Sequence, residues 1–151
     1  MDKKAFFART MHTPDDPPRA QMRAALRELS QTLLPLHRAL IEAAKSDYGF
    51  TVEPVTGPTH LLRLLGDDPF FAWLKPITAL IVDIDEMVRV DFEAAEAAKI
   101  ASRVKEFFNG NGGDFATHYV PILQRDVDVA IAHAAVRLAV GRLVAALPEE
   151  N

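Results

Sequence analysis

The sequence predicts an all-α fold, a helical bundle, and three observations support this prediction. Long stretches repeat apolar residues at spacings of three and four, the period of one face of a helix. No stretch combines alternating apolar and polar residues with the turn pairing of a hairpin. Prolines and glycines cluster between the periodic stretches, where helices end. We expect four long helices packed as a bundle, at about 19–47, 69–90, 92–109 and 126–147, with short helices near 2–11, 58–65 and 115–124.

The composition narrows the possible classes of protein. A chain of 151 residues is the usual size of one domain, and 49 % apolar with 25 % charged residues is ordinary for a soluble globular protein. The formal net charge of −4 argues against general nucleic-acid binding, which needs clustered positive charge. The absence of cysteine excludes disulfides and thiolate metal sites. The first residues lack the long apolar core of a secretory signal, so we expect a cytoplasmic protein.

Residues 1–18 form a separate N-terminal segment in this prediction, and residues 19–147 form the helical bundle domain. Three prolines in the stretch 13–18, TPDDPP, cannot continue a helix. The short helix before them carries an apolar patch of Phe6, Phe7 and Met11, which can dock on its own domain or on a second subunit. Because the four long helices can already cover one another, we predict a homodimer whose interface includes this patch.

The first long helix, residues 19–47, has an apolar seam typical of helices packed at a shallow angle. Pro35 interrupts the helix and predicts a kink one turn before it, and Gly49 is a candidate left-handed stop. A connector over residues 50–59 follows, and Gly66 is expected to end the short helix after it. The seam consists of Met22, Leu26, Leu29, Leu33, Leu36, Leu40 and Ala43.

The stretch 68–90 is the central helix around which the other helices are expected to pack. Asp68 can cap it and Pro69 suits its first position. Pro76 either kinks this helix or marks its true start after a separate first turn. Its apolar face is wide enough to need more than one partner helix, and comprises Trp73, Ile77, Leu80, Ile84, Met87 and Val88.

Two further helices complete the prediction. Asp91 is the candidate cap of the helix at 92–109, and the glycine-rich loop after it lacks the lysine and hydroxyl residue of a phosphate-binding loop. Asp126 or Asp128 caps the last helix, whose charged residues argue against a membrane span. One of its two apolar sides contains alanine and glycine at seam positions, so we expect close central packing there. That side is Val127, Ile131, Ala134, Leu138, Gly141 and Ala145, and the other is Val129, Ala132, Val136, Val140 and Leu143.

The histidines give a weak indication of metal binding. Helical bundles often bind metals between facing helices, but no histidine has a glutamate three residues before it and no two histidines lie four residues apart. The two histidines on the long helices that we expect nearest the core are His37 and His133, which are therefore the candidate ligands. Asp114 and His118 are four residues apart, but Asp114 is already a candidate helix cap.

The carboxylates offer a second candidate metal site. Asp83 and Glu86 lie one helical turn apart and could share a cation, and Glu93 and Glu96 repeat this spacing on the next helix. Such pairs resemble the magnesium site of all-α nucleotide pyrophosphatases, although only six residues separate them here. This resemblance implies the alternative function of a metal-dependent phosphohydrolase using bundle carboxylates.

Nucleophilic catalysis has no support in the sequence. Ser30, Ser46 and Ser102 all fall within predicted helices, and none lies in a sharp G-x-S-x-G turn. Asp85 has a plain partner in Arg89, four residues later on the same helix. We therefore predict no catalytic residues and no cofactor.

Three stretches, HRALIE at 37–42, DPFFAWLKP at 68–76 and IDE at 84–86, resemble a family of small bacterial proteins without a known activity. The resemblance extends over roughly residues 25–140 and implies a bacterial, intracellular, helical protein with no catalytic residues to transfer. We expect a non-enzymatic interaction module or a small-ligand-binding protein, with the ligand itself unknown and with no nucleic acid or membrane as partner.

Overall fold

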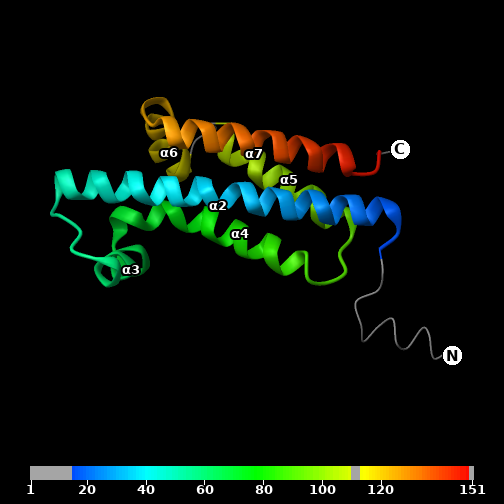
Figure 1. Ribbon diagram of the computed structural model, residues 1–151, viewed down its shortest axis with the longest axis horizontal. Helices are drawn as coiled ribbons and strands as arrows, with labels where there is room; N and C mark the ends of the chain where they lie inside the picture. Colours follow the sequence, from blue (N-terminus) through cyan, green and yellow to red (C-terminus); the bar gives the residue numbers. More distant parts are fainter. Residues whose placement is uncertain (1–14, 110–112, 150–151) are drawn as a thin grey trace.

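The computed structural model describes residues 15–109 and 113–149, and over these residues it contains helices and no strand (Figure 1). The all-α prediction is confirmed. The predicted short helix at 2–11 and its patch of Phe6, Phe7 and Met11 lie outside the described residues. The helices in chain order are α2 (Pro17–Thr51), α3 (Pro58–Asp67), the 3-10 helix η1 (Pro69–Leu74), α4 (Lys75–Met87), α5 (Ala94–Phe108), α6 (Gly113–Arg125) and α7 (Val127–Ala146).

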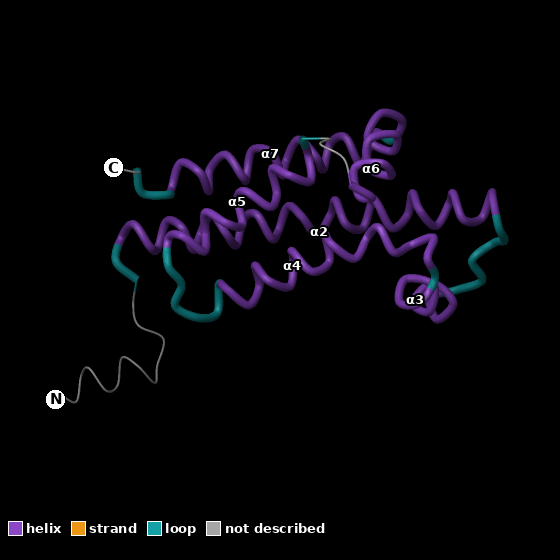
Figure 2. Tube along the Cα trace, turned by 180° about the vertical axis from the view of Figure 1, so that it is seen from behind, coloured by secondary structure: helices purple, strands orange, loops and turns teal. Residues whose placement is uncertain are grey.

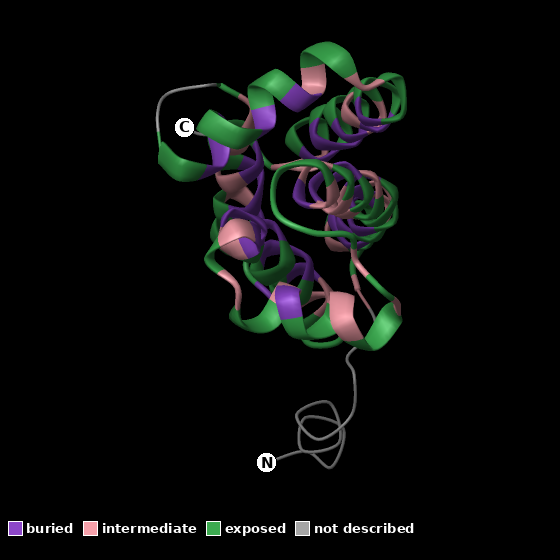
Figure 3. Cartoon of the chain, turned by 90° about the vertical axis from the view of Figure 1, so that its left-hand side faces the viewer, coloured by how far each residue is buried: buried purple, intermediate pink, exposed green. Residues whose placement is uncertain are grey.

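The longest helix, α2, runs the length of the molecule, and α7 returns antiparallel along it (Figures 1 and 2). Helix α4 packs on another side of α2, and α5 contacts α2, α4 and α7. Helices α3 and α6 lie at the end of the molecule where α2 finishes. Seen along the bundle, the buried residues face the space between the helices and the exposed residues form the outer surface (Figure 3). The core therefore lies between α2, α4, α5 and α7.

Helix α2 begins inside the proline-rich stretch, two residues before the predicted start. The Asp16 carboxylate accepts a hydrogen bond from the Arg19 backbone N–H at 3.0 Å, and Pro17 and Pro18 occupy the first helical positions, where a missing N–H is harmless. The predicted seam is confirmed, because all seven of its residues are buried: Met22, Leu26, Leu29, Leu33, Leu36, Leu40 and Ala43.

The predicted stop at Gly49 is wrong. The helix continues through Pro35 and through Gly49 to Thr51, and Gly49 does not have a positive φ. The last turn is held by the Tyr48 carbonyl, which accepts from the Val52 backbone N–H at 2.8 Å. The Tyr48 ring is buried against the two phenylalanine rings of η1, so tertiary packing keeps this end helical.

The predicted single long helix over 69–90 is also wrong, because it is two helices, η1 and α4. Pro76 has no backbone N–H to donate to the Ala72 carbonyl, which accepts instead from the Lys75 N–H in the tighter 3-10 pattern. Of the two roles considered for Pro76, the structure has the start of a new helix after a separate first turn. The predicted apolar face is buried at Trp73, Ile77, Leu80 and Ile84.

The ends of α3, α5, α6 and α7 lie within two residues of the predicted ends, whereas α4 ends three residues before the predicted end at 90. Glu93 rather than Asp91 caps α5, because Glu93 and Glu96 form a capping box in which the Glu93 backbone N–H donates to the Glu96 carboxylate. Helix α3 passes through Gly66 and ends at Asp67. Helix α6 begins at Gly113, whose φ of 86° lies in the left-handed region that favours glycine.

Helix α7 turns the unexpected side toward the core. Asp126 is its cap, accepting from the Val129 backbone N–H at 3.1 Å. All six residues of the side predicted to pack centrally are exposed, and the other side meets α2, α5 and α6. Helix α7 is also long and apolar enough to cross a membrane. The core helices of soluble proteins can have the same length and composition. The buried side is Val129, Ala132, Val136, Ala139, Val140 and Leu143.

The exposure of Gly141 determines whether a larger residue at this position stabilises or destabilises the chain. A Cβ built on Gly141 would meet no atom within 4 Å, so the expected close helix contact at this position is wrong for the single chain. Gly141→Leu should raise the free energy of unfolding by about 0.5–1 kcal/mol, because leucine has the higher helix propensity. Urea unfolding at the lowest usable protein concentration measures the change. A loss of stability would place Gly141 against another part of the same chain.

Candidate functional site

The two candidate histidines have separate partners on different helices. His37 Nε2 lies 2.9 Å from the Thr78 hydroxyl of α4, whereas His133 Nδ1 lies 2.7 Å from the Tyr119 hydroxyl of α6. Among the residues that the structure describes, no three His, Asp or Glu side chains lie close enough to hold a metal ion. Each histidine is thus a half-buried polar group satisfied by one hydroxyl.

The candidate carboxylates serve in contacts between and within helices. Asp83 accepts from Arg103 of α5 at 2.7 Å, which joins α4 to α5. Glu86 on the next turn is exposed, and Glu93 and Glu96 form the capping box of α5. The spacing that suggested a shared cation therefore has a structural explanation at three of the four carboxylates.

Asp85 also has a different partner from the one expected. Its carboxylate accepts from the buried Ser30 hydroxyl at 2.6 Å, across the contact between α4 and α2. This interaction satisfies the hydroxyl in the middle of the leucine seam of α2. Ser30 is therefore a packing residue with a bonded hydroxyl.

His133 belongs to an aromatic cluster between α5, α6 and α7. The Phe108 ring lies 4.5 Å from the His133 ring and 5.7 Å from the Tyr119 ring, centroid to centroid. Burial raises the pKa of the Tyr119 hydroxyl, and burial followed by the charge of Arg137 lowers the pKa of His133. Both groups are therefore neutral near pH 7, and a hydrogen bond joins the Tyr119 hydroxyl to His133 Nδ1.

Both half-buried histidines make stability depend on pH. Burial lowers the pKa of His37 as well as that of His133, so the unfolded chain binds these protons more tightly than the folded chain. Their contribution to stability is complete above the histidine pKa of the unfolded chain, about 6.5, and is lost as the pH falls below that pKa. We expect the free energy of unfolding to decrease from about pH 7 to pH 5. Urea titrations of the parent and of His37→Gln/His133→Gln measure this slope, which should be shallower in the double variant.

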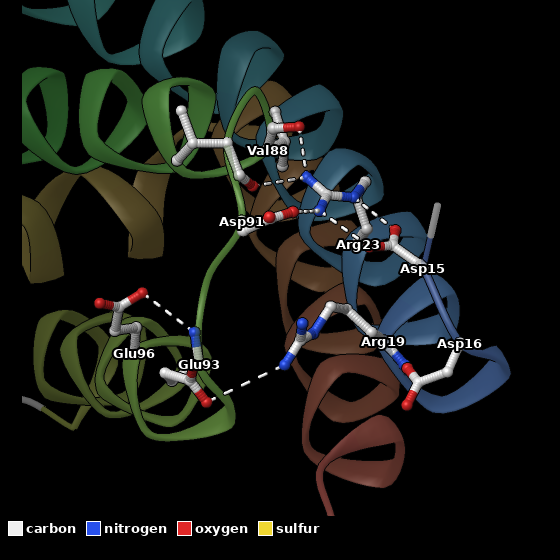
Figure 4. A network of polar contacts seen from close by, with 9 residues as sticks. Asp15, Asp16, Arg19, Arg23, Val88, Asp91, Glu93 and Glu96 are labelled. Atoms are coloured by element: carbon white, nitrogen blue, oxygen red, sulfur yellow. Dashed lines mark hydrogen bonds and ion pairs between the residues drawn. The ribbon is translucent and has the colours of Figure 1, made fainter. Parts of the chain in front are cut away.

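A buried arginine joins the start of α2 to the loop between α4 and α5 (Figure 4). Arg23 donates from Nε and Nη2 to the two carboxylate oxygens of Asp15, at 2.7 and 3.1 Å. Its Nη1 donates to the carbonyl oxygens of Val88 and Val90 at 2.6 and 3.0 Å. The guanidinium lies 5.0 Å from the Phe92 ring centroid. The network therefore links the first turns of α2 to the loop between α4 and α5.

A half-open cavity of about 460 Å³ lies beside His37, between α2, α3, η1 and α4. Apolar side chains including Ile41, Leu65 and Phe71 line it. His37 and Lys75 also line the cavity and supply polar groups to it. The shape and lining suit a small, mostly apolar molecule carrying an acidic group.

The exposed side of α7 carries three large apolar side chains, and we call it the α7 outer face. Its three large side chains are 64–72 % exposed, although the opposite side of the same helix is buried. The other exposed large apolar residues are distributed over different helices and loops. The spacing along this face alternates between four and three residues, as in the seam of a coiled coil. The α7 outer face comprises Val127, Ile131, Ala134, Leu138, Gly141 and Ala145.

Comparison with known proteins adds no family to this description. The chain matches no protein-family model, no curated protein and no solved structure. The resemblance of three stretches to a bacterial family therefore stays a prediction.

Proposed function

We propose that this protein is a non-enzymatic interaction module whose α7 outer face binds another helix. The observation that carries the proposal is the exposure of Val127, Ile131 and Leu138, at 72, 66 and 64 %, on one side of a well-packed helix. Contiguous apolar surface of this kind on a folded chain commonly marks a partner surface. Full burial of one large apolar side chain against a partner would contribute roughly 1.5–3 kcal/mol of free energy.

The form of the α7 outer face supports a helix as the bound element. Its alternating spacing presents one narrow row of side chains along the helix axis, which is the row that a second helix packs against. Alanine and glycine at Ala134, Gly141 and Ala145 leave space for a partner helix to approach closely. Arg137 and Arg142 flank the row and supply the polar rim that protein interfaces have.

A photocrosslinking amino acid at Leu138 tests this function in the cells that produce the protein. The full chain should crosslink to a discrete protein species, and Ile131→Glu in the same chain should abolish the product. The control places the same amino acid at Leu62, which is 70 % exposed on α3 and outside the α7 outer face. Equal products from both positions, or a product that Ile131→Glu leaves unchanged, would overturn the proposal.

The cavity beside His37 favours a second candidate function, the binding of a small apolar anion. Anilinonaphthalene sulfonate is a suitable probe, since its rings match the apolar wall and its sulfonate matches Lys75. Ala79→Phe should fill part of the cavity and weaken probe binding severalfold. Val82→Phe on the exposed side of the same helix is the matched control and should leave binding unchanged. Equal affinity in both variants would exclude the cavity.

A further inference from the structure

We infer that the partner on the α7 outer face is a second copy of this chain, with the two α7 helices packed antiparallel about a two-fold axis. This inference rests on the proposed function and names its partner.

The residues of the face are complementary in size, large against small, when the second helix runs in the opposite direction. In the register centred between Ala134 and Leu138, every large side chain of one copy meets a small residue of the other. Alternating large and small residues across facing positions is how helices interdigitate without voids or overlap. The pairs are Val127 with Ala145, Ile131 with Gly141, and Ala134 with Leu138, each occurring twice by symmetry.

A parallel arrangement lacks this match. In a parallel pair in register, each residue would face the same residue of the second chain. Gly141 would then face Gly141 and Ala134 would face Ala134, while Leu138 would face Leu138. Layers of paired small residues leave gaps beside layers of paired large ones, and such gaps forfeit packing energy. The order of residues therefore favours the antiparallel pair.

The charges at the edges favour the same arrangement. Asp128 and Arg142 flank opposite ends of the row on the edge nearest α2, where Arg142 contacts Glu28 and Asp128 lines a cavity together with Arg38 of α2. In the antiparallel register Asp128 of each copy approaches Arg142 of the other, which gives two attractive pairs of opposite charge. The same register brings the two Arg137 side chains together at the centre, which gives one like-charge pair. The parallel register would instead bring Arg137 against Arg142 twice.

The row is long enough for a specific contact. It extends over the 19 residues from Val127 to Ala145, or about 27 Å of helix at a rise of 1.5 Å per residue. The opposite side of α7 is already buried in its own chain, so a second copy would complete the burial of the helix.

Two cysteine variants test the pairing in the full chain, which has no cysteine of its own. Chains carrying Ile131→Cys and Gly141→Cys, distinguished by a size tag, are oxidised separately and as a mixture. The antiparallel register sets residue 131 of one copy opposite residue 141 of the other. Residue 131 of one copy is displaced from residue 131 of the other by about 15 Å along the axis, beyond disulfide reach. A disulfide-linked product should therefore form in the mixture and not in either variant alone.

The other outcomes overturn the inference in different ways. Products from each variant alone would establish a parallel pair. No product under any condition, together with a monomeric mass, would show that a second copy does not cover the face. A crosslink from Leu138 to a different protein would then leave the proposed function standing while this inference fails.

Light scattering of the full chain provides an independent test. The parent should have twice the mass of one chain, and Leu138→Glu should be monomeric, while Leu62→Glu on α3 should remain dimeric. Gly141→Leu is the sharpest variant, because it should stabilise the single chain yet dissociate the pair by meeting Ile131 of the second copy. A Gly141→Leu variant that remains dimeric would overturn the register.

Discussion

Arg23→Met should lower the free energy of unfolding by about 3–5 kcal/mol, the cost of breaking a buried ion pair by removing one partner. The side chain of Arg23 is 4 % exposed and that of Asp15 is 9 % exposed, so the carboxylate would stay in a poorly hydrated site without the guanidinium. The carbonyl groups of Val88 and Val90 would also lose their donor. Methionine keeps much of the apolar volume, so the loss reports the polar contacts.

Urea unfolding measures this effect, with Arg19→Met as the matched control one turn earlier on α2. Arg19 is 35 % exposed and lies 3.9 Å from the Glu93 carboxylate, so its replacement should cost less than about 1 kcal/mol. The double variant Asp15→Asn/Arg23→Met should recover part of the loss, because no charge is then left buried. A loss at Arg23 no larger than that at Arg19 would show that the network does not hold α2 to the α4–α5 loop.

Ile84→Ala should destabilise the protein by about 2–5 kcal/mol, as expected for a large-to-small change in a packed core. Ile84 is fully buried on the face of α4 that packs into the core, so the vacated volume would be enclosed. Val82→Ala on the same helix is the control, since Val82 is 48 % exposed and should change stability by less than about 0.5 kcal/mol. A loss under about 1 kcal/mol at Ile84 would mean that this face is not in the core.

The sequence predicts the fold class and the leucine seam of α2 correctly because both depend on local periodicity. The seam residues recur every three to four positions, and only a helix places them on one side. The break at Pro76 follows from one missing N–H, but local chemistry permits both a kink and a new helix. The extension of α2 past Gly49 depends on Tyr48 packing against η1, a contact between distant segments that periodicity does not report.

The face of α7 that points inward could not be predicted from its own sequence. Apolar residues surround nearly the whole helix, so two sides qualified as the core side. The contact with α2 decides between them, and it selects the side with Val136 and Leu143. The alanine and glycine on the other side predict close central packing there, but the structure leaves that side exposed.

The role of Arg23 was missed for a related reason. Its acceptors at Val88 and Val90 are backbone carbonyls more than 60 residues away, and a backbone carbonyl has no signature in the sequence. The indications available were two aspartates shortly before α2 and an arginine beside the buried Met22. The metal candidates His37, His133, Asp83 and Glu86 were drawn from spacing alone, and spacing does not reveal hydroxyl or arginine partners on other helices.

The pairing of α2 with α7 has a consequence for how the chain folds during translation. Val127, the first residue of α7, follows Thr51, the last residue of α2, by 76 positions, so a ribosome adding about 5–20 residues per second needs roughly 4–15 s to pass from one helix to the other. Throughout this interval the leucine seam of α2 can be covered only by the segments between Thr51 and Val127 that have already been synthesised. A nascent chain stalled before Val127 should consequently be a substrate for chaperones that hold exposed apolar helices, and one released after Ala146 should escape them.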